Sequence, residues 1–262
     1  MGVRGNLKLI FDYSKLNLKK EWQYKSSFFM QIITMMLNDF FFIIQWLIIY
    51  GLVDNISGYG FNETMLLWAI GAGTFGFMSV FFEGVRDIKS FIYEGKLDVY
   101  LTQPKSVLLN VICSKIGIAG IGDVIYSFVV LAIIGAPWQW YLIIIPVIIL
   151  SSFLFTAVYV VFASFSFYIK NGDASKISEK VIMGADKYPF GIWNHGVKFL
   201  LATVFPVLFY TIVPAEYLFL NFNIWWVLGY IGVTALWVVL AFVLFNHGLK
   251  RYSSGSLMSV RL

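Results

Sequence analysis

The first candidates for chemistry in this sequence are two aspartates that lie inside long apolar runs. Asp39 lies within the run 28–53, and Asp123 lies within the run 107–134. A charged side chain at the centre of a membrane-spanning helix costs about 2.5–3.5 kcal/mol on insertion scales, so it is usually paired, neutralised or next to an aqueous cavity. Two interpretations stay open. The aspartates line a path through the protein, or they form hydrogen bonds that hold helices together.

Three amide side chains accompany Asp39 on the first run. Gln31, Asn38 and Gln45 recur every seven residues and therefore share one helical face. Polar groups cannot face lipid at low cost, so we predict that this face points at other helices or at a water-filled path. Together with Asp39 and Asp123, these amides are our candidates for a translocation path.

No catalytic or metal-binding motif is recognisable in the sequence. The two histidines lie far apart and have no cysteine nearby, which makes a histidine-based metal site improbable. Gly95 and Lys96 are followed by Leu97 and lack the upstream glycine of a phosphate-binding loop. We therefore predict no catalytic residue and no metal ligand, and we expect that the chain cannot hydrolyse ATP by itself.

Membrane-spanning helices must position these polar side chains. The chain is 60% hydrophobic and 13% charged, whereas soluble domains carry about 25% charged residues. This composition predicts an all-α polytopic membrane protein with a single transmembrane domain over residues 1–262. Its apolar runs, each long enough for a span of ~20 residues, predict six spans at 28–53, 65–82, 107–134, 141–168, 196–213 and 224–245. Gly71, Gly73 and Gly76 give the second span a small-residue face for close helix contact.

The flanking segments carry their own patterns. Residues 1–27 have the periodicity of an amphipathic helix lying in the membrane interface, with Leu7, Phe11 and Trp22 near one face. A plain solvated basic tail is the alternative.

Prolines mark the second half of the chain. Residues 206–223 are apolar for a loop, so we predict that they re-enter the membrane. Pro189, Pro206 and Pro214 are expected to terminate or bend the segments that contain them.

The positive charges indicate an orientation. The 19 Lys and Arg are confined to the N-terminal segment, the region from Arg86 to Lys115, the region from Lys170 to Lys198, and the C-terminal tail. The other three predicted loops have none. By the positive-inside rule, both termini and both polar loops are expected on the cytoplasmic side.

The stretch 83–110 is the most conspicuous polar segment. It mixes both charge signs and places apolar residues on one face of a short helix, with a charged rim. That composition is typical of a helix that docks into a groove on a partner protein. An amphipathic helix resting on the lipid surface is the alternative.

Within this stretch, EGKLDVYLTQPKSVLL (94–109) resembles the characteristic cytoplasmic segment of permeases from type-2 ATP-binding-cassette exporters. The similar group is the roughly 260-residue bacterial family. KYPFGIW (187–193), FPVLFYTIVPAEYL (205–218) and GLKRYSSGSL (248–257) are similar to later blocks of that family, in the expected order.

This resemblance implies an N-terminal interfacial helix, six spans and a cytoplasmic coupling helix within 83–106. It also implies two permease subunits, identical or related, that enclose a path and bind two copies of an ATPase. ATP and magnesium would be bound in that partner and no cofactor in this chain. The implied docking residues are Asp87, Ile88, Phe91, Glu94, Lys96, Leu97, Asp98, Leu101 and Pro104.

The expected function is therefore the permease subunit of an ATP-driven exporter of a drug, lipid or hydrophobic peptide. Its expected location is the bacterial inner membrane, in contact with lipid and not with nucleic acid. Two alternatives are an ion-coupled secondary carrier, which would depend on Asp39 or Asp123 and need no ATPase, and a non-transporting membrane scaffold or enzyme.

Overall fold

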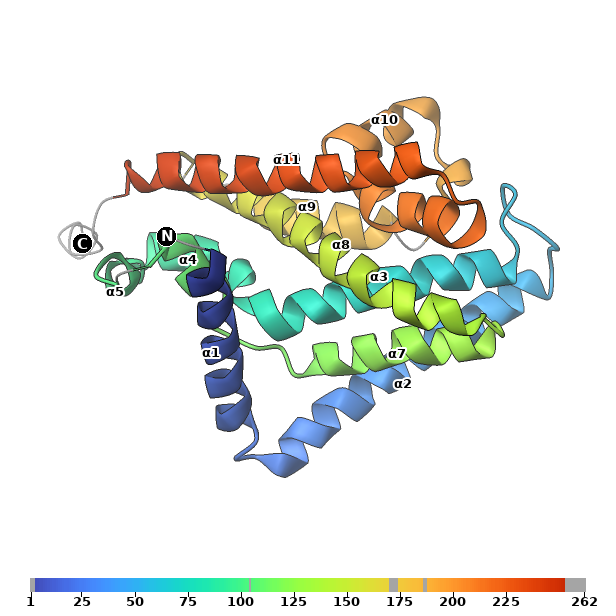
Figure 1. The fold of residues 1–262 in the computed structure, drawn as a ribbon, viewed down its shortest axis with the longest axis horizontal. Coiled ribbons are helices and arrows are strands. Elements are labelled where there is room, and N and C mark those ends of the chain that lie inside the picture. Colours follow the sequence, from blue (N-terminus) through green and yellow to red (C-terminus); the bar gives the residue numbers. More distant parts are fainter. Residues whose placement is uncertain (1–2, 104, 170–173, 186–187, 253–262) are drawn as a thin grey trace.

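The computed structural model describes residues 3–103, 105–169, 174–185 and 188–252, and it is built from helices (Figure 1). The longer elements are α1 (Val3–Glu21), α2 (Lys25–Tyr50), α3 (Phe61–Phe82), α7 (Ala119–Ile133), α8 (Trp138–Ser164), α9 (Ala174–Ala185), α10 (His195–Thr203) and α11 (Ile224–Leu249). The shorter ones are η1 (Glu83–Asp87), α4 (Ile88–Tyr93), α5 (Asp98–Leu101), α6 (Val107–Ile112), η2 (Phe165–Phe167), η3 (Phe190–Ile192), η4 (Leu208–Ile212) and η5 (Ala215–Leu220). The predicted all-α class is confirmed.

Helices α2, α3, α7, α8 and α11 run roughly along the long axis of the molecule and form its bundle (Figure 1). One end holds α1, α4 and α5, and we call it the α1 end. The opposite end holds the loop 51–60 and α10, and we call it the far end.

Glycines allow the closest helix contacts in the bundle. A Cβ added at Gly76 of α3 would lie 2.5 Å from the Gly120 carbonyl oxygen of α7. A Cβ at Gly122 of α7 would lie 2.9 Å from the Ile32 carbonyl oxygen of α2. Both distances are too short for a real Cβ, so glycine is required where α7 wedges against α2 and α3. The small-residue face predicted for the second span is therefore found at this contact.

Helix α1 lies across the end of the bundle rather than along it (Figure 1). The Asn17 side chain donates a hydrogen bond to the Cys113 carbonyl oxygen at 3.1 Å, which fixes α1 to the end of α6. On another face, Leu7, Phe11 and Trp22 are exposed. This apolar face is free to contact a lipid headgroup layer, as expected of an interfacial helix.

Among the described residues, four helices are long and apolar enough to cross a membrane: α2, α3 with its extension to Tyr93, α8 with its extension to Phe167, and α11. Helix α10 and the segment Leu208–Leu220 would make a fifth if they counted as one span, but they are bent by 76°. Helix α7 has only 15 residues. A polytopic membrane protein is thus supported, whereas six spans are not confirmed.

The predicted third span is not one continuous helix. The run 107–134 divides into α6 and α7, with an irregular segment between Ile112 and Ala119. At this break the Gly117 amide donates a hydrogen bond to the Ser79 carbonyl oxygen of α3 at 2.8 Å. A backbone N–H that has no partner within its own helix is thus paired with α3.

The predicted fifth span, 196–213, is bent, as expected from Pro206. It is interrupted after Thr203, and Pro206, which has no amide proton to donate, lies buried at the bend. The chain forms a helical hairpin at the far end, close to the predicted re-entrant segment 206–223. Pro214 is buried inside this hairpin, between η4 and η5.

The second polar loop, 169–194, was expected on the same side as the two termini, but in the structure it extends along the bundle. Helix α9 runs back along α8, so the chain reaches the far end by residue 191. A Cβ added at Gly191 would lie 2.4 Å from the Ser57 Cβ in the loop 51–60. Pro189 is buried in this stretch.

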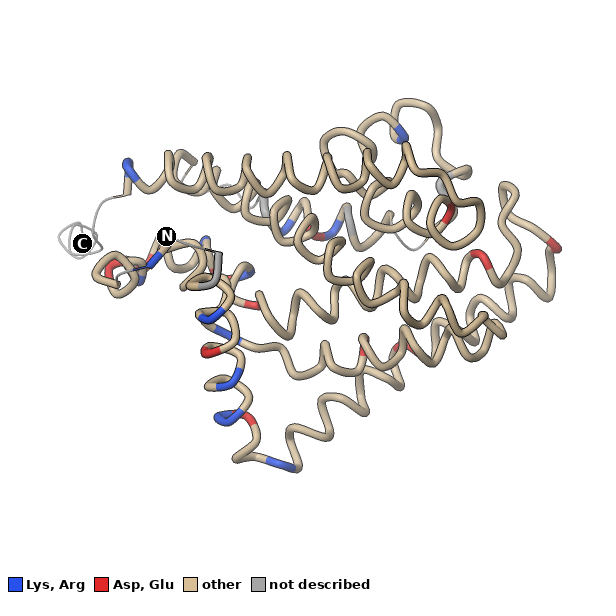
Figure 2. The backbone as a smooth tube through the Cα atoms, in the orientation of Figure 1, with Lys and Arg blue, Asp and Glu red and all other residues tan. Residues whose placement is uncertain are grey.

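Lys198 lies on α10 at the far end. The prediction that every Lys and Arg lies at the same end of the molecule is therefore wrong for this residue. Most of the remaining Lys and Arg still gather toward the α1 end (Figure 2). Lys187 falls outside the described residues.

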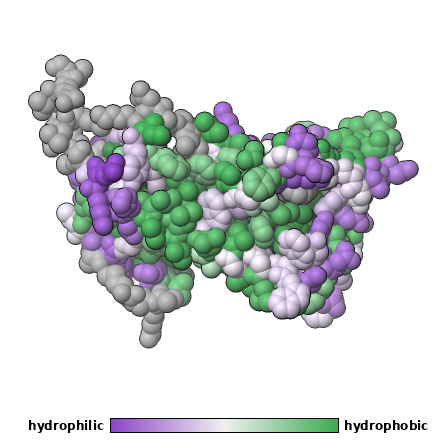
Figure 3. Space-filling view, turned by 90° about the horizontal axis from the view of Figure 1, so that it is seen from above, coloured by the Kyte–Doolittle hydropathy of each residue, from purple (hydrophilic) through white to green (hydrophobic). Residues whose placement is uncertain are grey.

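The outer surface of the bundle is apolar. Figure 3, which looks onto the α11 side, shows hydrophobic side chains across the middle and hydrophilic ones toward the two ends. On α11, Trp225, Leu236 and Val239 are 59–78% exposed. Such a belt is suited to lipid contact.

Candidate functional site

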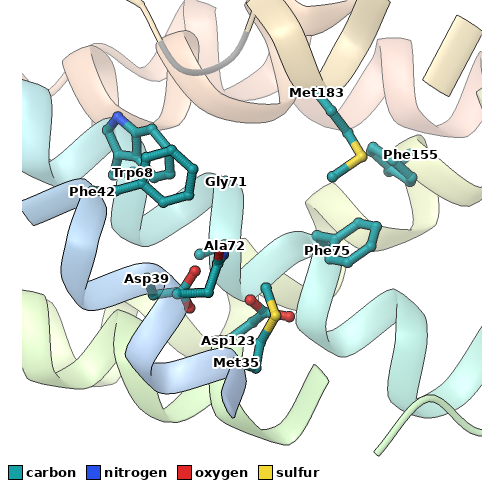
Figure 4. A pocket seen from close by; sticks show the side chains of 11 residues that line it. Met35, Asp39, Phe42, Trp68, Gly71, Ala72, Phe75, Asp123, Phe155 and Met183 are labelled. Atoms are coloured by element: carbon teal, nitrogen blue, oxygen red, sulfur yellow. The ribbon is translucent and has the colours of Figure 1, made fainter. Parts of the chain in front are cut away.

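The candidate site is a cavity of about 300 Å³ between α2, α3, α7, α8 and α9 (Figure 4). Its lining combines two acids and one amide with aromatic and sulfur-containing side chains. The lining residues are Met35, Asn38, Asp39, Phe42, Trp68, Gly71, Ala72, Phe75, Asp123, Phe155 and Met183. Three of the five predicted path residues therefore meet at one cavity.

The close approach of α7 to α2 and α3 brings Asp39 and Asp123 together. Asp123 follows Gly122, where α7 touches α2, and its Cβ lies against Gly76 of α3. Both aspartates are 2% exposed. Their carboxyl groups are joined by a hydrogen bond, which requires that one of them keeps its proton, because a carboxylate only accepts.

The second carboxyl oxygen of Asp123, Oδ2, has no hydrogen-bond partner among the described residues. The hydroxyl of Tyr126, one turn further along α7, is likewise buried without such a partner. An unsatisfied buried polar atom costs about 1–3 kcal/mol. Among the described residues, nothing satisfies these two buried oxygens, which therefore reduce the stability of the bundle.

The amide stripe of α2 lies mostly outside the cavity. Gln31, Asn38 and Gln45 share one face as predicted, and all three are exposed on the single chain. Gln31 and Asn38 line a second, more open hollow of about 570 Å³, which shares Met35 and Asn38 with the first. Gln45 lines neither, so the structure does not join it to the aspartates.

Sequence reasoning missed the apolar half of the cavity. Trp68, Phe75 and Phe155 appear in the sequence as ordinary apolar residues of their spans. Met183 was missed because α9 was read as part of a surface loop. The only available signal was its amphipathic pattern, with Ser178 and Glu179 buried in the structure and Lys176 exposed.

The second candidate region is the segment 83–106 at the α1 end. Ile88 and Leu97 are fully buried, and Phe91 is 8% exposed, because all three pack into the core of this chain. The expectation that they anchor a partner protein is therefore corrected. Their role is to fix the segment onto the bundle.

The outward face of this segment is made of other side chains. Leu101 is 46% and Val99 64% exposed, and the exposed Glu94 and Lys96 form a salt bridge with each other beside them. Val99 was not among the predicted docking residues. Pro104 falls outside the described residues.

Two of the predicted charged residues have partners within the chain. Asp87 forms a salt bridge with Lys115, which follows α6. Asp98 lies beside Tyr252, and burial together with this carboxylate raises the pKa of the Tyr252 hydroxyl to about 12. These contacts hold the segment against the break in the third run and against the end of α11.

A charged cluster joins the segment to α9. Arg86 Nη2 lies 2.7 Å from Glu179 Oε1, and Arg86 Nη1 lies 3.2 Å from Glu83 Oε1. The Tyr159 hydroxyl of α8 donates to Glu179 Oε2 at 3.2 Å. Sequence reasoning placed Arg86 at the edge of the docking segment but gave it no partner, since the partner lies 93 residues further along the chain.

At the far end, a hydrogen bond joins the loop 51–60 to the hairpin. The Tyr59 hydroxyl in the loop 51–60 donates a hydrogen bond to Glu216 of η5. Burial and this carboxyl group raise the pKa of Tyr59. The hairpin is also packed against the start of α8, where the Trp140 and Phe219 rings lie 5.2 Å apart.

Comparison with known proteins identifies the chain. No curated protein and no solved structure matches it significantly. The family model described as "ABC-2 family transporter protein" matches residues 33–256, which is most of the chain and includes the cavity, the segment 83–106 and the far-end hairpin. The chain therefore belongs to the ABC-2 family of transporter proteins, in which it is a membrane permease subunit.

Proposed function

We propose that this permease subunit works in an ATP-driven exporter and receives the energy of ATP hydrolysis from a separate ATPase through the segment 83–106. The observation that carries the proposal is the construction of that segment. Its inner face is fixed to the bundle by Ile88, Phe91 and Leu97, and its outer face is left exposed.

The exposed face has the chemistry of a docking surface. Val99 and Leu101 provide apolar area, and Glu94 and Lys96 provide a charged rim. An apolar centre with a polar rim is the usual anatomy of a protein interface. Because the buried face couples this surface to α9 through Arg86 and Glu179, a movement of the bound ATPase would be transmitted toward the cavity.

The test is a pair of substitutions on the exposed face. We expect Val99→Asp/Leu101→Asp to lose the ATPase on co-purification, because two charges would be buried in the interface, while the permease remains inserted. The matched control is Leu52→Asp, which changes a residue that is 82% exposed next to the far-end loop. A normal yield of ATPase with the double variant would contradict the docking assignment.

We propose further that a second permease subunit, identical or related, covers the amide stripe of α2. Gln31, Asn38 and Gln45 are exposed on the single chain, and lipid could not satisfy their hydrogen bonds. The assembly would then contain two permease subunits and two ATPase copies, with ATP and magnesium held by the ATPase. Cysteine cross-linking at Gln45 between two copies tests this arrangement.

We place the α1 end in the bacterial cytoplasm, because most Lys and Arg gather there. The far end, with its hairpin and the contact between Tyr59 and Glu216, would then face outward. Protection of tags on both termini in intact cells is the expected result.

An ion-coupled carrier is the second candidate, and the pair of Asp39 and Asp123 is the observation that favours it. The two functions differ in one measurement. A carrier transports in proteoliposomes that contain this chain and an ion gradient but no ATPase, whereas the proposed exporter subunit does not.

A further inference from the structure

We propose that a basic hollow between η1, α8 and α9 binds the headgroup of an anionic phospholipid, with Lys176 and Lys180 as its main contacts. The hollow has a volume of about 590 Å³. Its lining includes Arg86, Tyr159, Lys176, Glu179, Lys180 and Gly184. This inference goes beyond the proposed function and does not depend on it.

The lining of the hollow has a net positive charge. Three of its residues are cations, namely Arg86, Lys176 and Lys180. The only acid among the lining residues is Glu179. If Glu83, which pairs with Arg86 from η1, is counted as well, one positive charge remains in excess. A hollow lined mainly by one sign of charge attracts ions of the opposite sign, so we expect an anionic ligand.

The acid of the hollow has its partners within the chain. Glu179 Oε1 lies 2.7 Å from Arg86 Nη2. The other carboxyl oxygen, Oε2, accepts a hydrogen bond from the Tyr159 hydroxyl at 3.2 Å. Because both oxygens of this buried acid are paired in this way, Glu179 does not depend on a lysine for its counter-charge.

The two lysines lie on adjacent turns of α9. Lys176 and Lys180 are four residues apart and both are exposed, so they share one face of the helix. Among the described residues, no acid forms an ion pair with Lys180. Lys176 has a contact within the chain, so we expect Lys180 to contribute more to binding. Ammonium groups are common phosphate ligands in proteins.

The edge of the hollow next to Lys180 suits an acyl chain. A Cβ added at Gly184 would have none of the described residues within 4 Å, so there is open space beside this glycine. Ile177, seven residues earlier on the same face of α9, is 59% exposed. An acyl chain can therefore lie against Ile177 and Gly184 while its headgroup lies at Lys180.

The position of the hollow along α8 also favours a lipid. The candidate span that ends at Phe167 has 30 residues, which is about 45 Å of helix and exceeds a hydrocarbon core of ~30 Å. Its last turns therefore reach the headgroup region, and Tyr159 lies about two turns before that end. Long lysine side chains extend from such a depth to the headgroups. Basic pockets between membrane helices typically bind anionic lipid headgroups.

The experiment is native mass spectrometry of the full chain, purified with any partner that it retains. The chain is titrated with dimyristoyl phosphatidylglycerol, which is anionic, and with dimyristoyl phosphatidylcholine, which has the same acyl chains but no net charge. We expect phosphatidylglycerol to bind at least about fivefold more tightly, since each lysine near an anionic headgroup contributes about that factor.

Two variants of α9 test the assigned residues. Lys180→Gln should weaken phosphatidylglycerol binding about fivefold, and Lys176→Gln/Lys180→Gln should weaken it at least about tenfold. Neither should change the affinity for phosphatidylcholine. Because both lysines are exposed, these variants should fold. Lys180→Arg keeps the charge and should retain binding.

Two further variants separate this hollow from general surface charge. Lys250→Gln removes another exposed lysine, at the end of α11, and is the matched control that should leave binding unchanged. Gly184→Leu fills the open space beside Lys180 and should weaken the binding of both lipids.

Equal affinity of the wild type for the two lipids would overturn the inference. So would unchanged phosphatidylglycerol binding in Lys176→Gln/Lys180→Gln, wild-type binding of both lipids in Gly184→Leu, or an equal loss in Lys250→Gln. A final arm adds water-soluble sn-glycerol 3-phosphate as a competitor. If it displaces phosphatidylglycerol at equal concentration, the hollow is a site for a free phosphate compound, and the assignment to a lipid is wrong.

Discussion

Arg86 offers the sharpest test of how the docking segment is joined to the bundle. It is the only residue among those described that pairs with both Glu83 of η1 and Glu179 of α9. Replacing it by methionine keeps the side-chain length but removes the charge. Two acids would then lie close together without their cation, and Glu179 is buried.

The magnitude follows from the burial of this pair. Breaking a fully buried ion pair costs about 3–5 kcal/mol, and an exposed pair contributes about 0.2–1 kcal/mol. The Arg86 side chain is 39% exposed and that of Glu179 only 11%, so we expect a loss near 2 kcal/mol in the free energy of unfolding. At about 2–4 °C per kcal/mol, the unfolding temperature should fall by roughly 4–8 °C.

The assay is thermal unfolding of detergent-purified Arg86→Met, Glu179→Gln and the double variant. The two changes should not add, because each removes the same contact, and the coupling should exceed about 0.5 kcal/mol. Lys96→Met is the matched control. Its pair with Glu94 is more than half exposed, so the substitution should leave the unfolding temperature nearly unchanged. If Arg86→Met lowers the free energy of unfolding by the same amount in the wild type and in Glu179→Gln, the reasoning is refuted.

Three further predictions follow from single contacts. Gly76→Ala should destabilise the protein by about 1–3 kcal/mol, because its Cβ would lie 2.5 Å from the Gly120 carbonyl oxygen and 2.7 Å from the Asp123 Cβ; unchanged unfolding would contradict the close approach of α3 and α7. Tyr59→Phe should lower the free energy of unfolding by about 1–3 kcal/mol, because Glu216 is left with one hydrogen bond fewer. It should also increase proteolysis of the far-end hairpin. Proteolysis at the wild-type rate would argue that this contact is not formed. Asn17→Ala should lower the free energy of unfolding by about 1 kcal/mol, because the hydrogen bond to the Cys113 carbonyl oxygen is lost. It should also detach α1, so amide hydrogen exchange in α1 should become faster. Exchange as slow as in the wild type would count against the contact.

Much of the bundle could be predicted from hydrophobic runs and glycines. The runs that became α2, α8 and α11 are long and predominantly apolar, so length alone identified them. Gly73 and Gly76 marked the face of α3 that touches other helices, since only small residues allow such contact.

The second half of the chain could not be predicted in the same way. Helix α9 is short and carries Lys176, Glu179 and Lys180, so its composition resembles that of a surface loop. Its place beside α8 depends on Arg86 and Tyr159, which satisfy Glu179 from distant parts of the sequence. In the apolar run 196–213, by contrast, Pro206 predicted the bend that the structure contains.

The candidate sites show the same limit. The sequence indicated that Asp39 and Asp123 are important, but their contact depends on Gly122 and Gly76 at a three-helix junction. In the docking segment, an amphipathic pattern predicted one buried and one exposed face. It did not say which face packs inward, and the structure buries Leu97 and exposes Val99.

The central claim is that this chain transports only as part of a complex with an ATPase. The most direct measurement is native mass spectrometry of the tagged chain purified from its own membranes in mild detergent. The expected result is an assembly with two ATPase copies and two permease subunits, from which Val99→Asp/Leu101→Asp removes the ATPase. A folded chain that carries no ATPase, and that transports in proteoliposomes with an ion gradient alone, would contradict the account.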